Sequence, residues 1–221
     1  MTHIKRDTPS GLYAITPESF SFTELMLWAE VLTRHGVKWF QYRKKQLSAA
    51  MKQQEARALQ SFFSERGAHL IVNDDVELAL EINAYGVHLG AQDLSLNELN
   101  IRYSTHPLMV GASCYQDLDL AMKAQAQGAD YVAFGSVFPS STKPHAAIAP
   151  LHLFDQDRTL GSITKVAIGG ITVNNAKAVI NAGADAIAVV GALANLATLN
   201  ETLQQFQQLI IESRMHHEHH Q

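Results

Sequence analysis

The sequence predicts an α/β fold, a single (β/α)8 TIM barrel, from three observations. Eight short apolar runs recur along the 221 residues, and a helical pattern follows each of them. The runs are almost continuously apolar, as in parallel strands that are buried on both faces. No linker or low-complexity segment interrupts the series, and eight strand–helix units close into a barrel. A doubly wound open sheet is the competing architecture.

The predicted strands lie between polar segments that contain glycine. In chain order they span residues 11–16, 37–43, 69–73, 86–90, 108–113, 130–137, 164–169 and 186–190. Parallel strands need a long crossover connection, which is usually a helix. In such a barrel all strands end on one face, so we expect the active site at their C-terminal ends.

Start and stop signals define the first two helices. Ser21 and Glu24 form a capping box, in which each side chain accepts from a free backbone N–H, and Gly36 supplies a left-handed stop. Ser48 is expected to begin the second helix, which ends near Gly67. These signals fix the spacing of the first three strands.

The last predicted helix should pack on the core through an apolar stripe. Residues of this stripe recur at three- and four-residue steps, and they are Leu196, Leu199, Leu203, Phe206 and Ile210. We expect one domain over residues 1–212, followed by a flexible His-rich tail at 213–221.

Composition and charge exclude several classes of function. The net charge of −4, without a basic block, argues against a nucleic-acid surface. No stretch approaches ~20 uninterrupted apolar residues, and the N-terminus lacks a signal-peptide pattern, so we expect no membrane partner. The one cysteine, Cys114, fits a cytoplasmic location. An oligomer is compatible with the sequence, which carries no signal for or against one.

Two carboxylates follow neighbouring predicted strands. Residues 70–75 (LIVNDD) pass directly from apolar residues to Asn73, Asp74 and Asp75, and Asp93 lies three residues after the next strand. Neighbouring strands are about 4.8 Å apart, so Asp74 and Asp93 can approach one cation. Two carboxylates and phosphate oxygens suit Mg²⁺. The alternative is a helix cap or a solvated loop, which we prefer for Asp75.

Basic residues and glycines at the other strand ends suggest two anion sites. Arg43, Lys45 and Lys143 would surround the carboxylates, as expected for a metal-bridged diphosphate, although each could be an ordinary surface charge. Gly169-Gly170 and Val190-Gly191 offer backbone amides to a separate phosphate, or they simply permit tight turns.

Two further residues are given structural roles. His88 lies inside a predicted strand and should be a packed barrel residue rather than a base. Cys114 has no evident His partner, so we do not expect a thiolate nucleophile.

With these residues in place, the chain resembles the thiamine phosphate synthase family. The shared motifs are Gln41-x-Arg43-x-Lys45, Asn73-Asp74, Gly86 to Gly90 with Asp93, Gly111-Ala-Ser113, Gly128 to Tyr131, Ser140-x-Thr142-Lys143, Ala167 to Ile171 and Gly183-Ala-Asp185. They occur in family order and spacing over about residues 11–195. Together they are specific, whereas the Gly-Gly or Gly-Ala-Asp elements alone are shared with many phosphate-binding barrels.

The resemblance implies a Mg²⁺-dependent transferase of thiamine biosynthesis. Such an enzyme joins 4-amino-2-methyl-5-hydroxymethylpyrimidine diphosphate to 4-methyl-5-hydroxyethylthiazole phosphate. It releases thiamine phosphate and pyrophosphate through a pyrimidine cation. A reaction that forms a cation needs stabilisation of the leaving diphosphate rather than a general base.

The resemblance also implies roles for individual residues. The pyrimidine diphosphate would be held by Gln41, Tyr42, Arg43, Lys44, Lys45, Asn73, Ser113 and Lys143, with Arg43, Ser113 and Lys143 as the catalytic residues. The thiazole phosphate would be held by Ser140, Ser141, Thr142, Gly170, Val190 and Gly191. Asp74 and Asp93 would hold Mg²⁺.

The chain departs from the motifs of the family at a few positions. Gly191 stands where the family often has Ser, Ser140 replaces a common Thr, and Ala91-Gln92 replaces a more usual Gln-Glu.

The alternative functions are a thiazole tautomerase-like isomerase of the same fold and a catalytically inactive phosphate-binding barrel. The aspartate pair and Lys143 argue against the isomerase, and Asp74, Asp93, Arg43 and Lys143 together argue against the inactive barrel.

Overall fold

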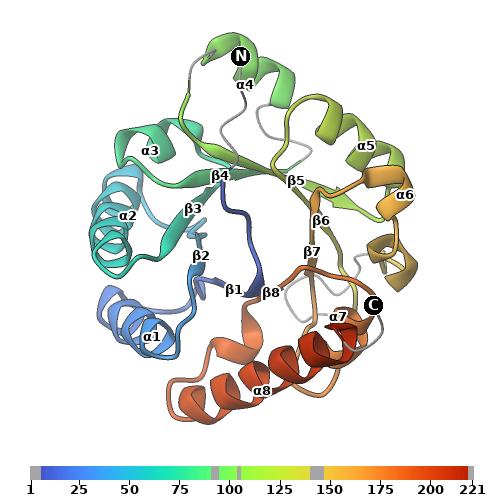
Figure 1. Cartoon of the computed structure of the whole chain (residues 1–221). Helices are drawn as coiled ribbons and strands as arrows, with labels where there is room; N and C mark the ends of the chain where they lie inside the picture. The colour runs from blue at the N-terminus through green and yellow to red at the C-terminus, as the bar shows by residue number, and fades with distance from the viewer. Residues whose placement is uncertain (1–5, 91–94, 104–105, 140–146, 219–221) are drawn as a thin grey trace.

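The computed structural model describes residues 6–90, 95–103, 106–139 and 147–218, with the backbone alone at 157 and 214–218. Eight parallel strands form a closed barrel in the order β1 to β8, with helices around its outside (Figure 1). The strands are β1 (Gly11–Ile15), β2 (Trp39–Tyr42), β3 (His69–Asn73), β4 (Gly86–Leu89), β5 (Met109–Tyr115), β6 (Tyr131–Phe134), β7 (Thr164–Ile168) and β8 (Ala186–Val189). Because β1 pairs with β8, the barrel is confirmed and an open sheet is excluded.

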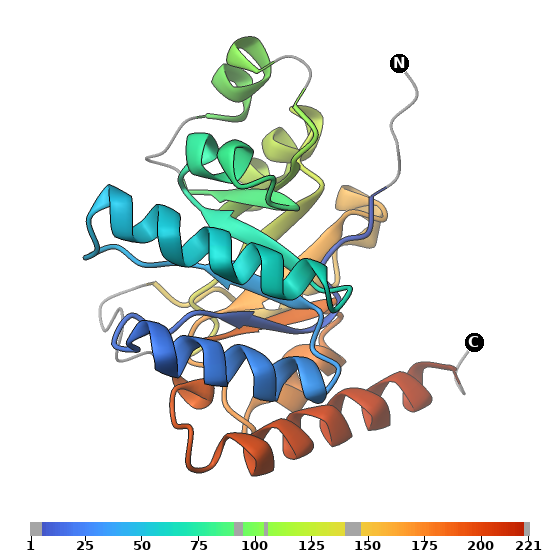
Figure 2. The same ribbon diagram turned by 90° about the vertical axis from the view of Figure 1, so that its left-hand side faces the viewer.

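Helices cover the outside of the barrel, as the side view shows (Figure 2). They are α1 (Phe22–Arg34), α2 (Ala49–Ser64), α3 (Val76–Glu81), α4 (Leu96–Arg102), α5 (Leu118–Ala126), α6 (Asp157–Leu160), α7 (Ala176–Asn181) and α8 (Leu199–Glu218), with 3-10 helices η1 (Leu151–Phe154) and η2 (Gly191–Leu193). The capping box at Ser21 and the cap at Ser48 are present as predicted. Gly36 and Gly67 have φ of 74° and 64° where these helices stop. No described helix is long and apolar enough to cross a membrane.

The connection from β6 to β7 contains the shortest α-helix of the described chain, α6, preceded by η1. Pro139, Pro144 and Pro150 occur in this connection. Proline lacks an N–H and disfavours the helical conformation of the residue before it. Among the described residues of this connection, helical structure is accordingly limited to η1 and the four-residue α6.

The last helix is longer than the sequence predicted. Leu199, Leu203 and Phe206 of α8 are buried as expected. The helix continues past residue 212 to Glu218, and Ser213 is buried. Residues 213–218, expected as part of a flexible tail, thus belong to α8, and residues 219–221 lie outside the described chain.

Strand alternation sorts the apolar side chains into two layers. One layer fills the barrel and consists of Tyr13, Ile15, Trp39, Ile71, Met109, Tyr131, Ala133, Val166, Ala186 and Ala188. The other packs between barrel and helices, and it includes Trp28, whose Nε1 donates to the Leu193 carbonyl at 3.0 Å. Successive residues of a strand face opposite sides. This alternation also decides which polar side chains face the barrel interior.

The two Gly-Ala-Asp elements hold the N-terminal ends of strands together. Asp130 accepts from the Val110 N–H at 2.7 Å, and its own N–H donates to the Val110 carbonyl at 2.7 Å. Asp185 does the same with Lys165, at 2.8 and 2.9 Å. These aspartates therefore fix strand register, far from the strand ends where a site is expected.

Candidate functional site

The alternation of β2 places Gln41 inside the barrel and Tyr42 outside it. Gln41 follows Trp39 on the inner face, and Arg43 comes next by the same alternation. Tyr42 belongs to the outer layer and donates through its hydroxyl to Glu55 of α2 at 3.1 Å. Burial, and then the Glu55 charge, raise the pKa of Tyr42. The structure thus separates Gln41 and Arg43 from Tyr42.

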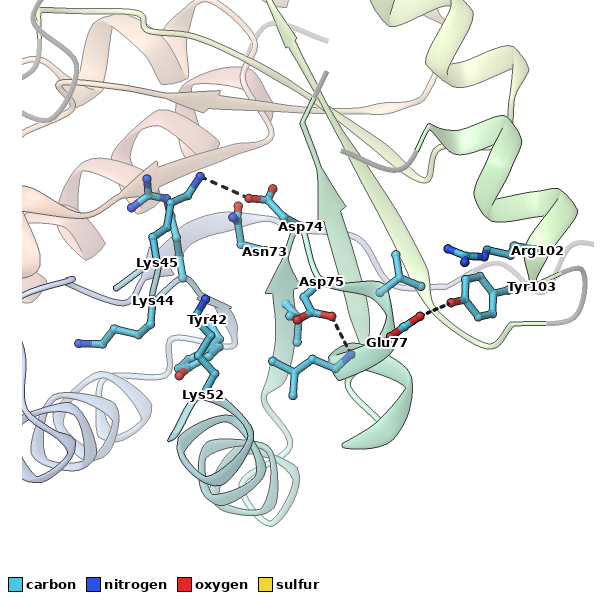
Figure 3. A pocket seen from close by; sticks show the side chains of 14 residues that line it. Tyr42, Lys44, Lys45, Lys52, Asn73, Asp74, Asp75, Glu77, Arg102 and Tyr103 are labelled. Atoms are coloured by element: carbon cyan, nitrogen blue, oxygen red, sulfur yellow. Dashed lines mark hydrogen bonds and ion pairs between the residues drawn. The ribbon is translucent and has the colours of Figure 1, made fainter. Parts of the chain in front are cut away.

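Lys44 also faces away from the barrel axis. Its ammonium donates to the carbonyls of Glu18 and Phe20 at 2.9 and 2.5 Å. Burial lowers the pKa of Lys44, opposed mainly by the negative charges of Glu55 and Glu18. In Figure 3 the Lys44 side chain points away from Asp74, whereas that of Lys45 reaches toward it. Lys44 therefore holds the loop after β1 against β2.

Glu18, which the sequence analysis did not single out, anchors the basic loop that follows β2. Its carboxylate accepts from the N–H groups of Lys45 and Gln46, each at 3.0 Å, and lies 3.9 Å from the Arg43 guanidinium. Burial tends to raise the pKa of Glu18. The two N–H donors and the charges of Arg43 and Lys44 outweigh it and lower that pKa. No periodic or motif signal marks a loop acid of this kind.

A charged cavity of about 510 Å³ opens where β2 and β3 end (Figure 3). Its basic lining residues are Arg43, Lys44, Lys45, Lys52 and Arg102, and its acidic ones are Asp74, Asp75 and Glu77. The Lys45 ammonium lies 3.4 Å from the Asp74 carboxylate, beside Asn73. Lys52 and Arg102 were not predicted, because they lie on helices that only the fold brings to this strand edge. The excess of basic groups suits an anionic ligand.

The two aspartates after β3 have different roles. Asp75 accepts from the Leu78 N–H at 2.9 Å, which confirms it as the cap of α3. Asp74 has a left-handed φ of 66°, and its N–H donates to the His88 carbonyl at 2.9 Å. The turn therefore directs one carboxylate into the helix and leaves Asp74 at the cavity.

The described donor set fits Mg²⁺ only as a partner of a phosphate. No group of three or more His, Cys, Asp or Glu side chains that could hold a metal occurs among the described residues. Mg²⁺ is commonly bound by one or two carboxylates and completed by substrate phosphates and water. Asp74 at an anion-binding cavity matches that pattern. Asp93, the predicted second ligand, lies outside the described residues, although β3 and β4 are neighbours as predicted.

Five polar side chains cross the barrel interior in a hydrogen-bonded chain. Gln41 Nε2 donates to the Tyr13 hydroxyl at 3.0 Å, and the Tyr13 and Tyr131 hydroxyls lie 3.1 Å apart. His88 Nδ1 lies 2.8 Å from the Tyr131 hydroxyl, and its Nε2 lies 2.9 Å from Ser113 Oγ. The burial predicted for His88 is confirmed, but its link to Ser113 was missed. Inward tyrosines on apolar strands are a usable signal, because a buried hydroxyl needs a partner.

The glycines after β7 and β8 differ in the room around them. At Gly170, with φ of 64°, an added Cβ would lie 2.4 Å from the Pro139 carbonyl oxygen. The Gly170 carbonyl accepts from Asn175 at 2.9 Å. At Gly191 an added Cβ would meet nothing within 4 Å. Ser140, Ser141 and Thr142, also predicted for the thiazole phosphate, and Lys143, predicted for the pyrimidine diphosphate, lie outside the described residues.

Cys114 is fully buried next to Ser113. Burial raises the pKa of its thiol to about 12, with a further contribution from Asp117. A thiol of this kind is protonated and inaccessible near neutral pH. The expectation that Cys114 is not a nucleophile agrees with its surroundings.

Comparisons with known proteins agree on one family. The sequence model of the thiamine monophosphate synthase family matches residues 12–193. A thiamine-phosphate synthase of Thioalkalivibrio sulfidiphilus is 50% identical over 181 residues, 81% of this chain and 85% of the relative. One of Methylobacillus flagellatus is 45% identical, over 90% of this chain and 94% of the relative. The thiamine phosphate pyrophosphorylase structure of Pyrococcus furiosus superposes with a TM-score of 0.79 at 29% identity, covering 91% of this chain and 96% of that one.

Proposed function

The chain belongs to the thiamine monophosphate synthase family, and from this premise we propose the reaction that its cavity performs. The enzyme joins 4-amino-2-methyl-5-hydroxymethylpyrimidine diphosphate to 4-methyl-5-hydroxyethylthiazole phosphate. The products are thiamine phosphate and pyrophosphate. The observation that carries this proposal is the basic cavity at the ends of β2 and β3, beside the Asp74 carboxylate.

The diphosphate is proposed to occupy this cavity. Arg43 and Lys45 supply positive charge, and the backbone that carries them is held in advance. The Arg43 N–H and carbonyl bond to Thr16 Oγ1 at 2.8 and 3.1 Å, and Glu18 holds the N–H of Lys45. Charge grows on the diphosphate as its C–O bond breaks, so donors fixed in advance stabilise the transition state more than the bound substrate.

The remaining pyrimidine residues come from β2, β3 and β5. Gln41 and Ser113 are proposed to bind the ring, and Asn73 lies on the inner face of β3 next to the cavity. Tyr42 and Lys44 are left out of the proposed ligand set, because their polar groups are bonded to Glu55 and to backbone carbonyls. Lys143 remains proposed from the family resemblance alone.

Asp74 and Asp93 are the residues proposed to hold Mg²⁺, which would supply positive charge next to the diphosphate oxygens. The thiazole phosphate is assigned to the segment after β6, to Gly170 and to Val190-Gly191. The open space beside Gly191 supports this assignment, because the backbone there can be approached closely. With both anions in place, the pyrophosphate leaves with the C–O bonding electrons, and the thiazole nitrogen then captures the pyrimidine-methyl cation at its methylene carbon.

The reaction is tested by incubating the purified protein with both substrates and Mg²⁺ and measuring thiamine phosphate by mass spectrometry. We expect product only when all three are present, and none after EDTA treatment until Mg²⁺ is restored. A pyrimidine monophosphate should not replace the diphosphate, because it lacks the pyrophosphate leaving group. Unchanged turnover in EDTA would remove the metal assignment, and turnover of the monophosphate would remove the leaving-group assignment.

Two adjacent aspartates provide a matched pair for the metal site. Asp74→Asn should raise the Mg²⁺ concentration that gives the half-maximal rate by about tenfold or more. Loss of a residue that binds or supports a metal typically weakens metal affinity by such a factor. Asn tolerates the left-handed φ of 66° at this position, so the backbone is preserved. Asp75→Asn removes the same charge one residue away but keeps the cap of α3, because Asn caps as well as Asp. The measurement is initial rate against Mg²⁺ for each variant, and equal shifts in both would contradict a metal role for Asp74.

A further inference from the structure

The interior hydrogen-bonded chain ends at two residues of the proposed pyrimidine site. It runs from Gln41 through Tyr13, Tyr131 and His88 to Ser113, with successive separations of 3.0, 3.1, 2.8 and 2.9 Å. Its members come from β2, β1, β6, β4 and β5, so it crosses the barrel interior. The two end residues would contact the ligand; Ser113 is partly exposed, while Gln41 and the three residues between them are buried.

Counting the protons of this chain shows that its two ends are not independent. A tyrosine hydroxyl carries one proton, and a neutral imidazole carries one proton on one of its two nitrogens. Gln41 Nε2 donates to Tyr13, and either hydroxyl of the Tyr13–Tyr131 pair can donate to the other. In one order, which starts from the Gln41 donor, the Tyr13 proton goes to Tyr131, the Tyr131 proton to His88 Nδ1, and the His88 proton on Nε2 to Ser113 Oγ. Each proton has one place in this order.

We propose that Tyr13, Tyr131 and His88 are positioning residues that fix Ser113 as a hydrogen-bond donor and Gln41 Oε1 as an acceptor toward the ligand. In the order above, Ser113 Oγ accepts from His88, so its own O–H points elsewhere. Gln41 uses its amide N–H on Tyr13, so its oxygen is left for a ligand donor. The opposite proton order would exchange both roles together, because every group between the ends must reverse.

This order selects a ligand with a particular pattern of groups. A ring nitrogen or oxygen that accepts must face Ser113, and an exocyclic N–H that donates must face Gln41. An aminopyrimidine has both, whereas a ring with a carbonyl or a hydrogen in place of the amino group lacks the donor. The inference rests on the proposed function, which places the pyrimidine at these two residues.

Two further observations indicate that the hydrogen-bonded chain of side chains is held in place. Gly111 leaves the space that the Tyr131 side chain occupies, because an added Cβ would lie 2.0 Å from Tyr131 Cζ and 2.3 Å from its hydroxyl oxygen. Burial raises the pKa of both Tyr13 and Tyr131, so each keeps its proton across the physiological range. The tyrosines thus remain hydroxyl groups with a single proton to place.

The test compares two ligands in two tyrosine variants. The ligands are the aminopyrimidine diphosphate and its analogue with hydrogen in place of the amino group, and their Kd values are measured by calorimetric titration. Tyr131→Phe removes one hydroxyl from the chain and keeps the ring. We expect it to reduce the preference for the amino compound by about five- to tenfold, the value of one oriented hydrogen bond.

The control is Tyr85→Phe, the same chemical change in a tyrosine that donates to the Asp7 carbonyl at 3.0 Å, outside the chain. It should leave the ligand preference unchanged. Inorganic pyrophosphate should bind both variants as it binds the unmodified protein, because it occupies only the basic cavity. In steady-state rates, Tyr131→Phe should raise KM for the pyrimidine substrate and leave KM for thiazole phosphate unchanged.

The effect of Tyr131→Phe should also disappear in a protein that already carries Ser113→Ala and Gln41→Ala, because the chain then has no end residue to orient. An unchanged preference in Tyr131→Phe, or an equal fall in Tyr85→Phe, overturns the proposal. If Tyr131→Phe lowers the yield of folded protein, Tyr13→Phe interrupts the same chain and the same outcomes apply. The binding preference is measured without turnover. Failure of the proposed role of the hydrogen-bonded chain can therefore be distinguished from failure of the protein to form thiamine phosphate.

Discussion

Arg43→Met should lower kcat by about 10²–10³, as the loss of one preorganised transition-state stabiliser typically does. The guanidinium lines the basic cavity and is 26% exposed, so its charge acts at the edge of the site rather than in bulk water. The effect falls on kcat because negative charge on the diphosphate increases as the C–O bond breaks. KM for thiazole phosphate should change little, since that phosphate does not leave.

The surroundings of Arg43 make this substitution interpretable. Glu18 still accepts from the N–H groups of Lys45 and Gln46 when the guanidinium is gone, so the loop should keep its place. Arg43→Lys retains the charge but not the planar fork, and it should recover part of the rate. Arg34→Met breaks an exposed ion pair with Glu30 on α1 and serves as the matched control, with no change in rate.

The measurement for these variants is steady-state kinetics with each substrate varied in turn, together with calorimetric titration of the pyrimidine diphosphate. A loss that appears chiefly in KM for thiazole phosphate would place Arg43 at the other anion. If Arg43→Met changed kcat no more than Arg34→Met does, Arg43 would not belong to the site.

The second large effect is expected when alanine replaces Gly170, and the same substitution at Gly191 serves for comparison. Gly170→Ala should raise KM for thiazole phosphate by about ten- to a hundredfold, because non-glycine residues at positive φ cost roughly 1–3 kcal/mol. Its Cβ would also lie 2.4 Å from the Pro139 carbonyl oxygen and 2.7 Å from that of Phe138, both backbone atoms. The loop must move, and its N–H groups move with it.

Gly191→Ala is the matched control. The added Cβ would meet nothing within 4 Å, and the glycine has no left-handed φ. It should therefore keep the backbone in place and raise KM for thiazole phosphate by less than Gly170→Ala does, and Gly191→Ser should be tolerated in the same way. Pyrimidine diphosphate should bind both alanine variants equally in a calorimetric titration. If Gly170→Ala instead abolishes diphosphate binding, the two anion sites are assigned the wrong way round.

Most strand positions could be predicted from sequence because they depend on local pattern. A buried parallel strand is an apolar run that ends at a polar or glycine residue, and β3 at His69–Asn73 has the predicted bounds. Helix signals are local in the same way, since the Ser21 capping box involves residues three apart. The end of α8 at Glu218 had no local signal, because the polar composition after residue 212 does not stop a helix that is packed through Leu203 and Phe206.

The sequence by itself determined the barrel and the strand ends at which Arg43, Lys45 and Asp74 lie. Those features follow from composition, periodicity and spacing along the chain. Only the tertiary structure decided which neighbouring side chains share the site. It turned Lys44 onto carbonyl groups and joined Gln41 to Ser113 through three buried groups from other strands. Such contacts depend on strand register and on the direction of each side chain, which closure of the barrel sets.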